Sequence, residues 1–174
     1  MAQADVYIVL DDVKNAHPTP EYTARLVVTG PATSPTGVTE PVGAAGSATL
    51  ARSSTTAPTS VTMKSNEIPN PPGSNTITVA ESETLTLTVT VNPGYKLGGV
   101  TALTLGVPLS PDTSSTDATT GVTVYTYTMP AADVDVKVDL IRDPDTELYR
   151  VTLDLTDPGS ANATNVHYSA YSAT

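Results

Sequence analysis

The chain has 174 residues, enough for one medium domain or two small ones, and its 8 Lys and Arg against 18 Asp and Glu give a net charge of −10. Such an acidic surface repels phosphate, so we expect neither nucleic-acid binding nor attraction to anionic membranes. The absence of Cys excludes disulfides and Cys-based sites, and no apolar run approaches the roughly 18 residues of a membrane helix, so no membrane insertion is expected either.

Threonine (31) and valine (20) dominate the composition, and β-branched residues favour strands. The clearest strand is 84–91, where Leu85, Leu87 and Val89 share one face and threonines share the other. In chain order, the predicted strands are 6–10, 22–28, 48–51, 60–64, 76–79, 84–91, 103–107, 122–129, 134–140 and 149–155. This pattern predicts an all-β fold of antiparallel sheets, either a β-sandwich or tandem small β-modules that are Ig-like or β-grasp-like.

The segments between these strands carry turn chemistry. Asn92-Pro93-Gly94 predicts a tight turn, in which Pro fixes one dihedral angle and Gly is free to adopt a positive one. Gly98-Gly99 predicts a bend within a strand, since no helix follows that could make it a phosphate loop. The polar stretches 30–46 and 110–120 are predicted to be loops or linkers.

An internal repeat joins the two ends of the chain. Residues 1–6 match residues 129–134 at an offset of 128, and residues 22–31 align with 149–158 after a one-residue gap. We interpret each copy as a β-hairpin, at 4–31 and at 132–158. The predicted organisation is therefore an N-terminal hairpin and linker (1–45), a central antiparallel repeat module (46–140), and a C-terminal segment that completes a second copy of the hairpin (141–174).

The repeat also suggests assembly. A terminal hairpin of one copy could complete the sheet of the next by strand addition, giving a rod in a tandem protein or a filament between separate chains. The candidate assembly strands are those of Val6, Ile8 and Leu10 and of Val134, Val136 and Val138.

One stretch carries a recognisable motif. A Thr/Val strand is followed by Pro93-Gly94-Tyr95, then by a variable loop, and then by Tyr127-Thr128-Met129-Pro130 and an Ala-Asp-Val strand that includes Asp133. In this order and spacing, residues 78–140 resemble a bacterial surface repeat, the divergent form of the internalin B-type repeat. Two positions depart from that family: Val100 stands where an aromatic residue is usual, and Tyr127 replaces a Phe.

The resemblance implies a bacterial protein that is extracellular or bound to the cell surface, with the module acting as a spacer, an adhesive unit or a protein contact. It implies no enzymatic activity and no cofactor. Considered on their own physics, the motif residues also look like packing: Tyr95 is an apolar plug with a polar tip, Met129 can fill an irregular gap, and Pro130 ends a ladder.

No other pattern predicts chemistry. The carboxylates near 11–12, 139–145 and 154–157 lack the spacing of a calcium loop, and a solvated acidic edge is the simpler reading. His17 and His167 have no partner at ligand spacing. We therefore expect no catalytic residue and no metal site.

The first hypothesis is a non-enzymatic extracellular structural or adhesive repeat module that contacts itself, as tandem copies or as a homo-oligomer, and that could also contact a host or cell-wall protein or glycan. The alternative is a phage virion protein, a decoration or tail component, which the initiating Met and the lack of a basic leader favour slightly. A carbohydrate-binding accessory module is the second alternative.

Overall fold

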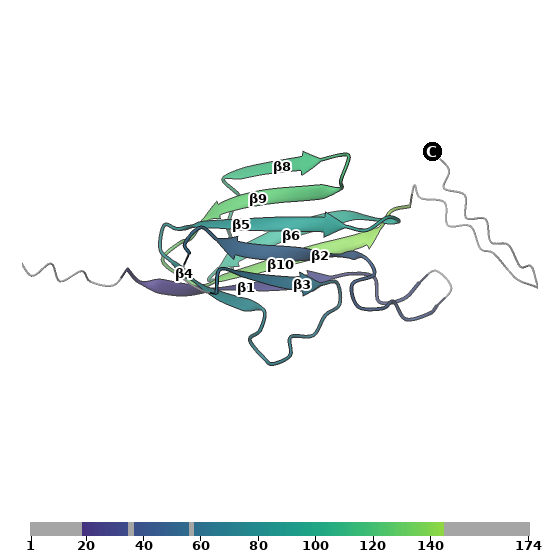
Figure 1. Cartoon of the computed structure of the whole chain (residues 1–174), viewed down its shortest axis with the longest axis horizontal. Helices are drawn as coiled ribbons and strands as arrows, with labels where there is room; N and C mark the ends of the chain where they lie inside the picture. The colour runs from purple at the N-terminus through teal and green to yellow at the C-terminus, as the bar shows by residue number, and fades with distance from the viewer. Residues whose placement is uncertain (1–18, 35–36, 56–57, 145–174) are drawn as a thin grey trace, which may run out of the picture.

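The computed structural model describes residues 19–34, 37–55 and 58–144. These residues form ten strands and no helix, arranged as two five-stranded sheets that pack face to face (Figure 1). The predicted all-β sandwich of mainly antiparallel sheets is confirmed.

Each sheet is named here after its central strand. The β10 sheet has the order β4 (Thr76–Ala80), β1 (Glu21–Thr29), β10 (Val134–Arg142), β6 (Tyr95–Thr104) and β7 (Val107–Pro108). The β5 sheet has the order β3 (Ser60–Lys64), β2 (Gly46–Arg52), β5 (Thr84–Val91), β9 (Val122–Thr128) and β8 (Thr113–Asp117). Every pairing between these strands is antiparallel except that of β1 with β10, which is parallel.

The core lies between the two sheets and follows the two-residue period of the strands. In β5, Leu85, Leu87 and Val89 are at most 1% exposed, and the intervening threonines face outward. Each such buried Leu or Val stabilises the fold by about 1.5–3 kcal/mol. The other strands contribute in the same way; fully buried examples are Leu26, Leu50, Ile77, Val79, Val136, Val138 and Leu140.

The outer face of the β5 sheet explains much of the threonine content. Threonines stand side by side on adjacent strands, and their hydroxyls are hydrogen-bonded in the pairs Thr49–Thr62 (2.8 Å) and Thr113–Thr126 (2.6 Å). Such cross-strand pairs add a few tenths of a kcal/mol up to about 1 kcal/mol each.

Seven of the predicted strands, namely those at 22–28, 48–51, 60–64, 76–79, 84–91, 122–129 and 134–140, are confirmed with small shifts of their ends. The strand predicted at 103–107 is wrong in extent, because β6 begins already at Tyr95 and the short β7 follows a turn at Leu105 and Gly106. The loop predicted at 110–120 contains β8. The strands predicted at 6–10 and 149–155 lie outside the described residues.

The predicted pairing of the terminal strands needs correction. β1 lies between β4 and β10, and β10 lies between β1 and β6, so both strands have neighbours on both sides. The expected hairpins at 4–31 and 132–158 would need edges of β1 and β10 that are already occupied. Because β1 is paired with β10, the boundary predicted at residues 45 and 46 does not separate β1 from the central module.

The same topology bears on the candidate assembly strands. Val134, Val136 and Val138 point into the core and are at most 2% exposed. Since β10 has no free edge, strand addition to it would require the sandwich to open. Val6, Ile8 and Leu10 lie outside the described residues.

The bend predicted at Gly98-Gly99 is a β-bulge within β6. Asp139 pairs with Gly99 and Leu140 pairs with Leu97, so Gly98 is the extra residue. A Cβ on Gly98 would lie 2.8 Å from Cγ2 of Ile141, which explains why the bulge carries a glycine.

Candidate functional site

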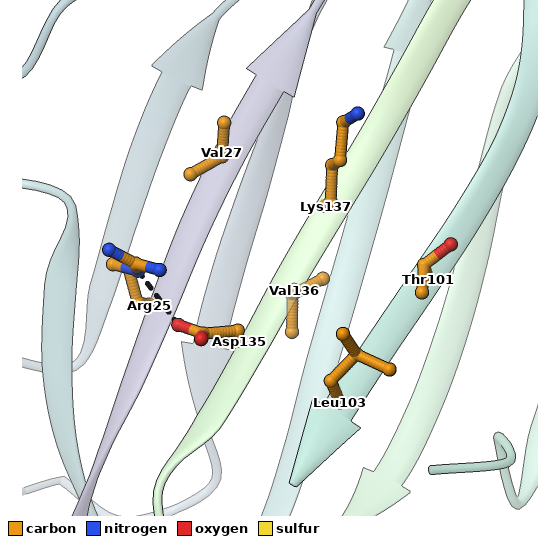
Figure 2. A pocket seen from close by; sticks show the side chains of 7 residues that line it. All are labelled: Arg25, Val27, Thr101, Leu103, Asp135, Val136 and Lys137. Carbon is orange, nitrogen blue, oxygen red and sulfur yellow. Dashed lines mark hydrogen bonds and ion pairs between the residues drawn. The ribbon is translucent and has the colours of Figure 1, made fainter. Parts of the chain in front are cut away.

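The outer face of the β10 sheet carries a shallow groove of about 280 Å³ (Figure 2). β1 contributes Arg25 and Val27, β6 contributes Thr101 and Leu103, and β10 runs between them. In Figure 2, Arg25 and Asp135 face each other at one side of the groove, and Lys137 stands further along β10. The groove therefore combines an apolar floor with a charged rim. The lining residues are Arg25, Val27, Thr101, Leu103, Asp135, Val136 and Lys137.

The rim belongs to a row of side-chain contacts that crosses from β10 to β1. Asp133 accepts a hydrogen bond from the backbone N–H of Thr23 (2.7 Å), Asp135 forms an ion pair with Arg25 (2.7 Å), and Asp139 accepts a hydrogen bond from the Thr29 hydroxyl (2.8 Å). All three links join residues 110 positions apart, because alternate outward residues of two strands in parallel register face each other. Asp139, one of the carboxylates interpreted as a solvated acidic edge, is thus part of a cross-strand link.

The groove has little to support catalysis. Its hydroxyl group is that of Thr101, and its carboxylate, Asp135, is paired with Arg25. Activation of a hydroxyl nucleophile needs an adjacent base, and the groove offers no such pair. In the ranges 19–34, 37–55 and 58–144, no cluster of His, Asp or Glu could hold a metal ion. No helix able to cross a membrane occurs in these ranges either.

A second, more open hollow of about 530 Å³ adjoins the first at Val27. It lies between the end of β1 and two loops, and it includes Val42 and Ile68, which are 56% and 84% exposed. An apolar surface of this kind suits contact with another protein better than it suits chemistry.

The most buried ion pair of the described residues lies at the end of the sandwich where β1 begins. The Arg52 side chain is 4% exposed and the Glu83 side chain 10%, and Nη2 of Arg52 lies 3.0 Å from Oε2 of Glu83. Arg52 also donates to the carbonyl of Thr78 (2.5 Å) and lies 3.5 Å from Glu21. Glu83 accepts hydrogen bonds from the backbone N–H groups of Ser54 and Ala80. This network ties the loop after β2 to the β4–β5 turn.

Burial alone would raise the pKa of Glu83. The hydrogen bonds from Arg52, Ser54 and Ala80 outweigh it, and the pKa is lowered below its ordinary value of 4.5. The bond to Glu83 likewise raises the pKa of Arg52, which therefore stays charged at all working pH values.

This lowered pKa predicts a pH-dependent loss of stability. Because the Glu83 carboxylate has a lower pKa folded than unfolded, its stabilisation is fully present above about pH 4.5 and is lost as the pH falls through the folded pKa. Glu83→Gln should therefore show a smaller fall in unfolding free energy than the unchanged protein between about pH 5 and pH 3. Urea titrations at several pH values measure this. Glu81→Gln, at an exposed neighbouring position, is the matched control, and an equal slope for Glu83→Gln would contradict the prediction.

The opposite end of the sandwich is held by Arg142, at the end of β10. Its guanidinium pairs with Glu40 and donates to the carbonyl of Thr33 (3.2 Å), and it stacks over the Tyr95 ring at 5.4 Å from the ring centre. These contacts fasten the loop between β1 and β2 onto the sheet.

The motif residues separate into two groups at opposite ends of β10. At the C-terminal end of β10, Pro93 and Gly94 form the β5–β6 turn, where the Tyr95 N–H donates to the Asn92 carbonyl (3.2 Å) and Gly94 has a φ of 85°. At the N-terminal end of β10, Tyr127 and Met129 are buried, and Pro130 and Asp133 lead into the strand. The structure thus places Pro93, Gly94, Tyr95, Tyr127, Met129, Pro130 and Asp133 in turns and packing, and does not bring them together into one site.

Neither the groove nor the Arg52–Glu83 pair was predicted from the sequence. One signal was present for the pair: Arg52 continues the inward row of Ala48 and Leu50, and a buried Arg requires an acidic partner. The groove had no comparable signal, because it depends on β1 and β6 flanking β10.

Comparison of the chain with protein-family models, with curated proteins and with solved structures finds no match.

Proposed function

We propose that the chain is a non-enzymatic structural or adhesive repeat module of an extracellular or cell-surface protein of a bacterium. The observation that carries this proposal is the parallel pairing of β1 with β10. The first and last described strands run in the same direction through the middle of one sheet, so the chain enters the sandwich at one end and leaves it at the other (Figure 1). This is the path that a spacer in a linear array requires.

The internal repeat supports the same proposal. Residues 129–134 lead into β10, and their match lies at residues 1–6, before the sandwich. Residues 22–31 contain most of β1, and their match lies at 149–158, after the sandwich. The sequence before the sandwich therefore resembles the segment that leads into β10, the last strand of a preceding copy. The sequence after the sandwich resembles β1, the first strand of a following copy. In such an array the contacts between modules follow one another head to tail.

An adhesive contact would use the groove and the adjoining hollow. Val27, Val42 and Ile68 are exposed there, beside the charged side chains of Arg25 and Lys137. This combination fits a protein partner.

Surface labelling tests the proposal. Antibodies raised against the purified chain should label intact cells of the source organism, and brief protease treatment of intact cells should remove the label. A cytoplasmic protein serves as the control and should be labelled only after permeabilisation. If the chain is labelled only in permeabilised cells, or only on phage particles, the proposal is wrong.

A further inference from the structure

We infer that the sandwich bears tensile load along its long axis, and that the seam between β1 and β10 is the element that resists it. The inference rests on the proposed function for the origin of the load, since a spacer in a surface array is pulled at both ends. The mechanical resistance itself follows from the strand geometry and can be measured separately.

The direction of pull relative to the hydrogen bonds decides the resistance. The chain continues for 18 residues before Thr19 and for 30 residues after Pro144, so tension reaches the start of β1 and the end of β10. In a parallel pair these two points lie at opposite ends of the shared ladder. Pulling them apart slides the strands along each other and loads all the hydrogen bonds together. Six register pairs, from Ala24–Val134 to Thr29–Asp139, share this load.

Side chains reinforce the same seam. The links Thr23–Asp133, Arg25–Asp135 and Thr29–Asp139 cross from β1 to β10 along the outer face. Two of them involve a carboxylate and a neutral donor and one is an ion pair, so all are charge-assisted. Figure 2 shows the middle link, which spans the gap between the two strands. Sliding the strands would break these links together with the backbone ladder.

The neighbouring strands prevent the seam from being peeled from one side. β10 is paired with β6 through nine residue pairs, and β1 with β4 through five. Beyond β4, Asn75 continues the edge of β1: its carbonyl accepts from the Leu26 N–H (2.9 Å) and its side-chain amide donates to the Leu26 carbonyl (2.8 Å). Asn66 continues this edge at Val28, because its backbone N–H donates to the Val28 carbonyl (3.0 Å). Both strands of the seam are therefore held within the sheet.

Single-molecule force spectroscopy on the full-length chain tests the inference. The chain contains no Cys, so two introduced cysteines give unique attachment points. Thr19→Cys with Pro144→Cys pulls the seam in shear, whereas Thr19→Cys with Ala131→Cys pulls the two strands from the same end and breaks the ladder one pair at a time. The unfolding force should be at least about twofold higher in the first geometry, because the register pairs then share the load. Equal forces would overturn the inference.

A variant of the seam sharpens the test. Asp133→Ala, Asp135→Ala and Asp139→Ala together remove three of about ten cross-seam links and should lower the shear force by about one third, with a smaller change in the peeling geometry, where the links break one at a time. Lys137→Ala is the matched control, since Lys137 lies in the same row opposite Val27. Circular dichroism confirms that each variant is folded. An unchanged shear force in a folded triple variant would show that the side-chain links do not reinforce the seam, and that part of the inference would be wrong.

The two proposals can fail independently. Intracellular labelling with a high shear force would refute the surface role and leave the mechanical resistance in place. Surface labelling with equal forces in the two pulling geometries would support the surface role and refute the mechanical resistance of the seam.

Discussion

Arg52→Ala is expected to lower the free energy of unfolding by about 3 kcal/mol, because it leaves the Glu83 carboxylate buried without its partner. The carbonyl of Thr78 would also lose its donor. Most of the cost arises from the charge left behind, since the attraction within a buried pair is largely offset by its desolvation. Urea unfolding followed by circular dichroism at pH 7 measures the change.

The control for this variant is Arg25→Ala, which breaks the ion pair with Asp135. Both partners of that pair are more than half exposed, so the loss should be at most about 1 kcal/mol. If the two variants lose the same stability, the Arg52 site is not behaving as a buried pair, and our account of that end of the sandwich is wrong.

Gly46→Ala is expected to be as damaging, for a reason of backbone shape. Gly46 begins β2 with a φ of 136°, a conformation that residues with a side chain rarely adopt. A Cβ there would lie 2.2 Å from the carbonyl oxygen of Thr90 in the adjacent β5. Since β2 and β5 must separate to accept it, we expect a loss of more than about 2 kcal/mol, measurable as a lower urea midpoint.

Gly73→Ala separates the two parts of that effect. Gly73 also has a positive φ, 87°, but no atom lies within 4 Å of the position of its Cβ. It should therefore show the conformational cost alone, about 1 kcal/mol. A loss at Gly46→Ala no greater than that at Gly73→Ala would show that β5 moves aside without cost.

Local pattern predicted the strands well wherever one face is buried. β3 and β5 were predicted with their observed bounds, because their apolar residues alternate with polar ones. β8 was missed because all five of its residues are polar and exposed, so it has no buried face to leave a period in the sequence. The start of β6 was missed because two glycines and a bulge interrupt its alternation.

Pairing partners were harder to predict than strands. Neighbours in sequence are the default partners for a hairpin, and this reasoning assigned β1 to the segment before it. The observed partner, β10, lies 110 residues away in the register. The aspartates of β10 alternate with its buried valines and face outward, yet their function as links became visible only once β1 was known to lie beside them. The groove depended on the same missing information.

The distance along the chain between β1 and β10 has a consequence for biosynthesis. At the usual rates of translation, residue 134 emerges roughly 5–20 s after residue 24. During that interval the central partner of β1 does not yet exist, and the sheet that contains it cannot be completed. Long-range pairing of this kind also slows folding. The β10 sheet therefore closes only after its last strand has emerged, whereas every strand of the β5 sheet has already been made by residue 128.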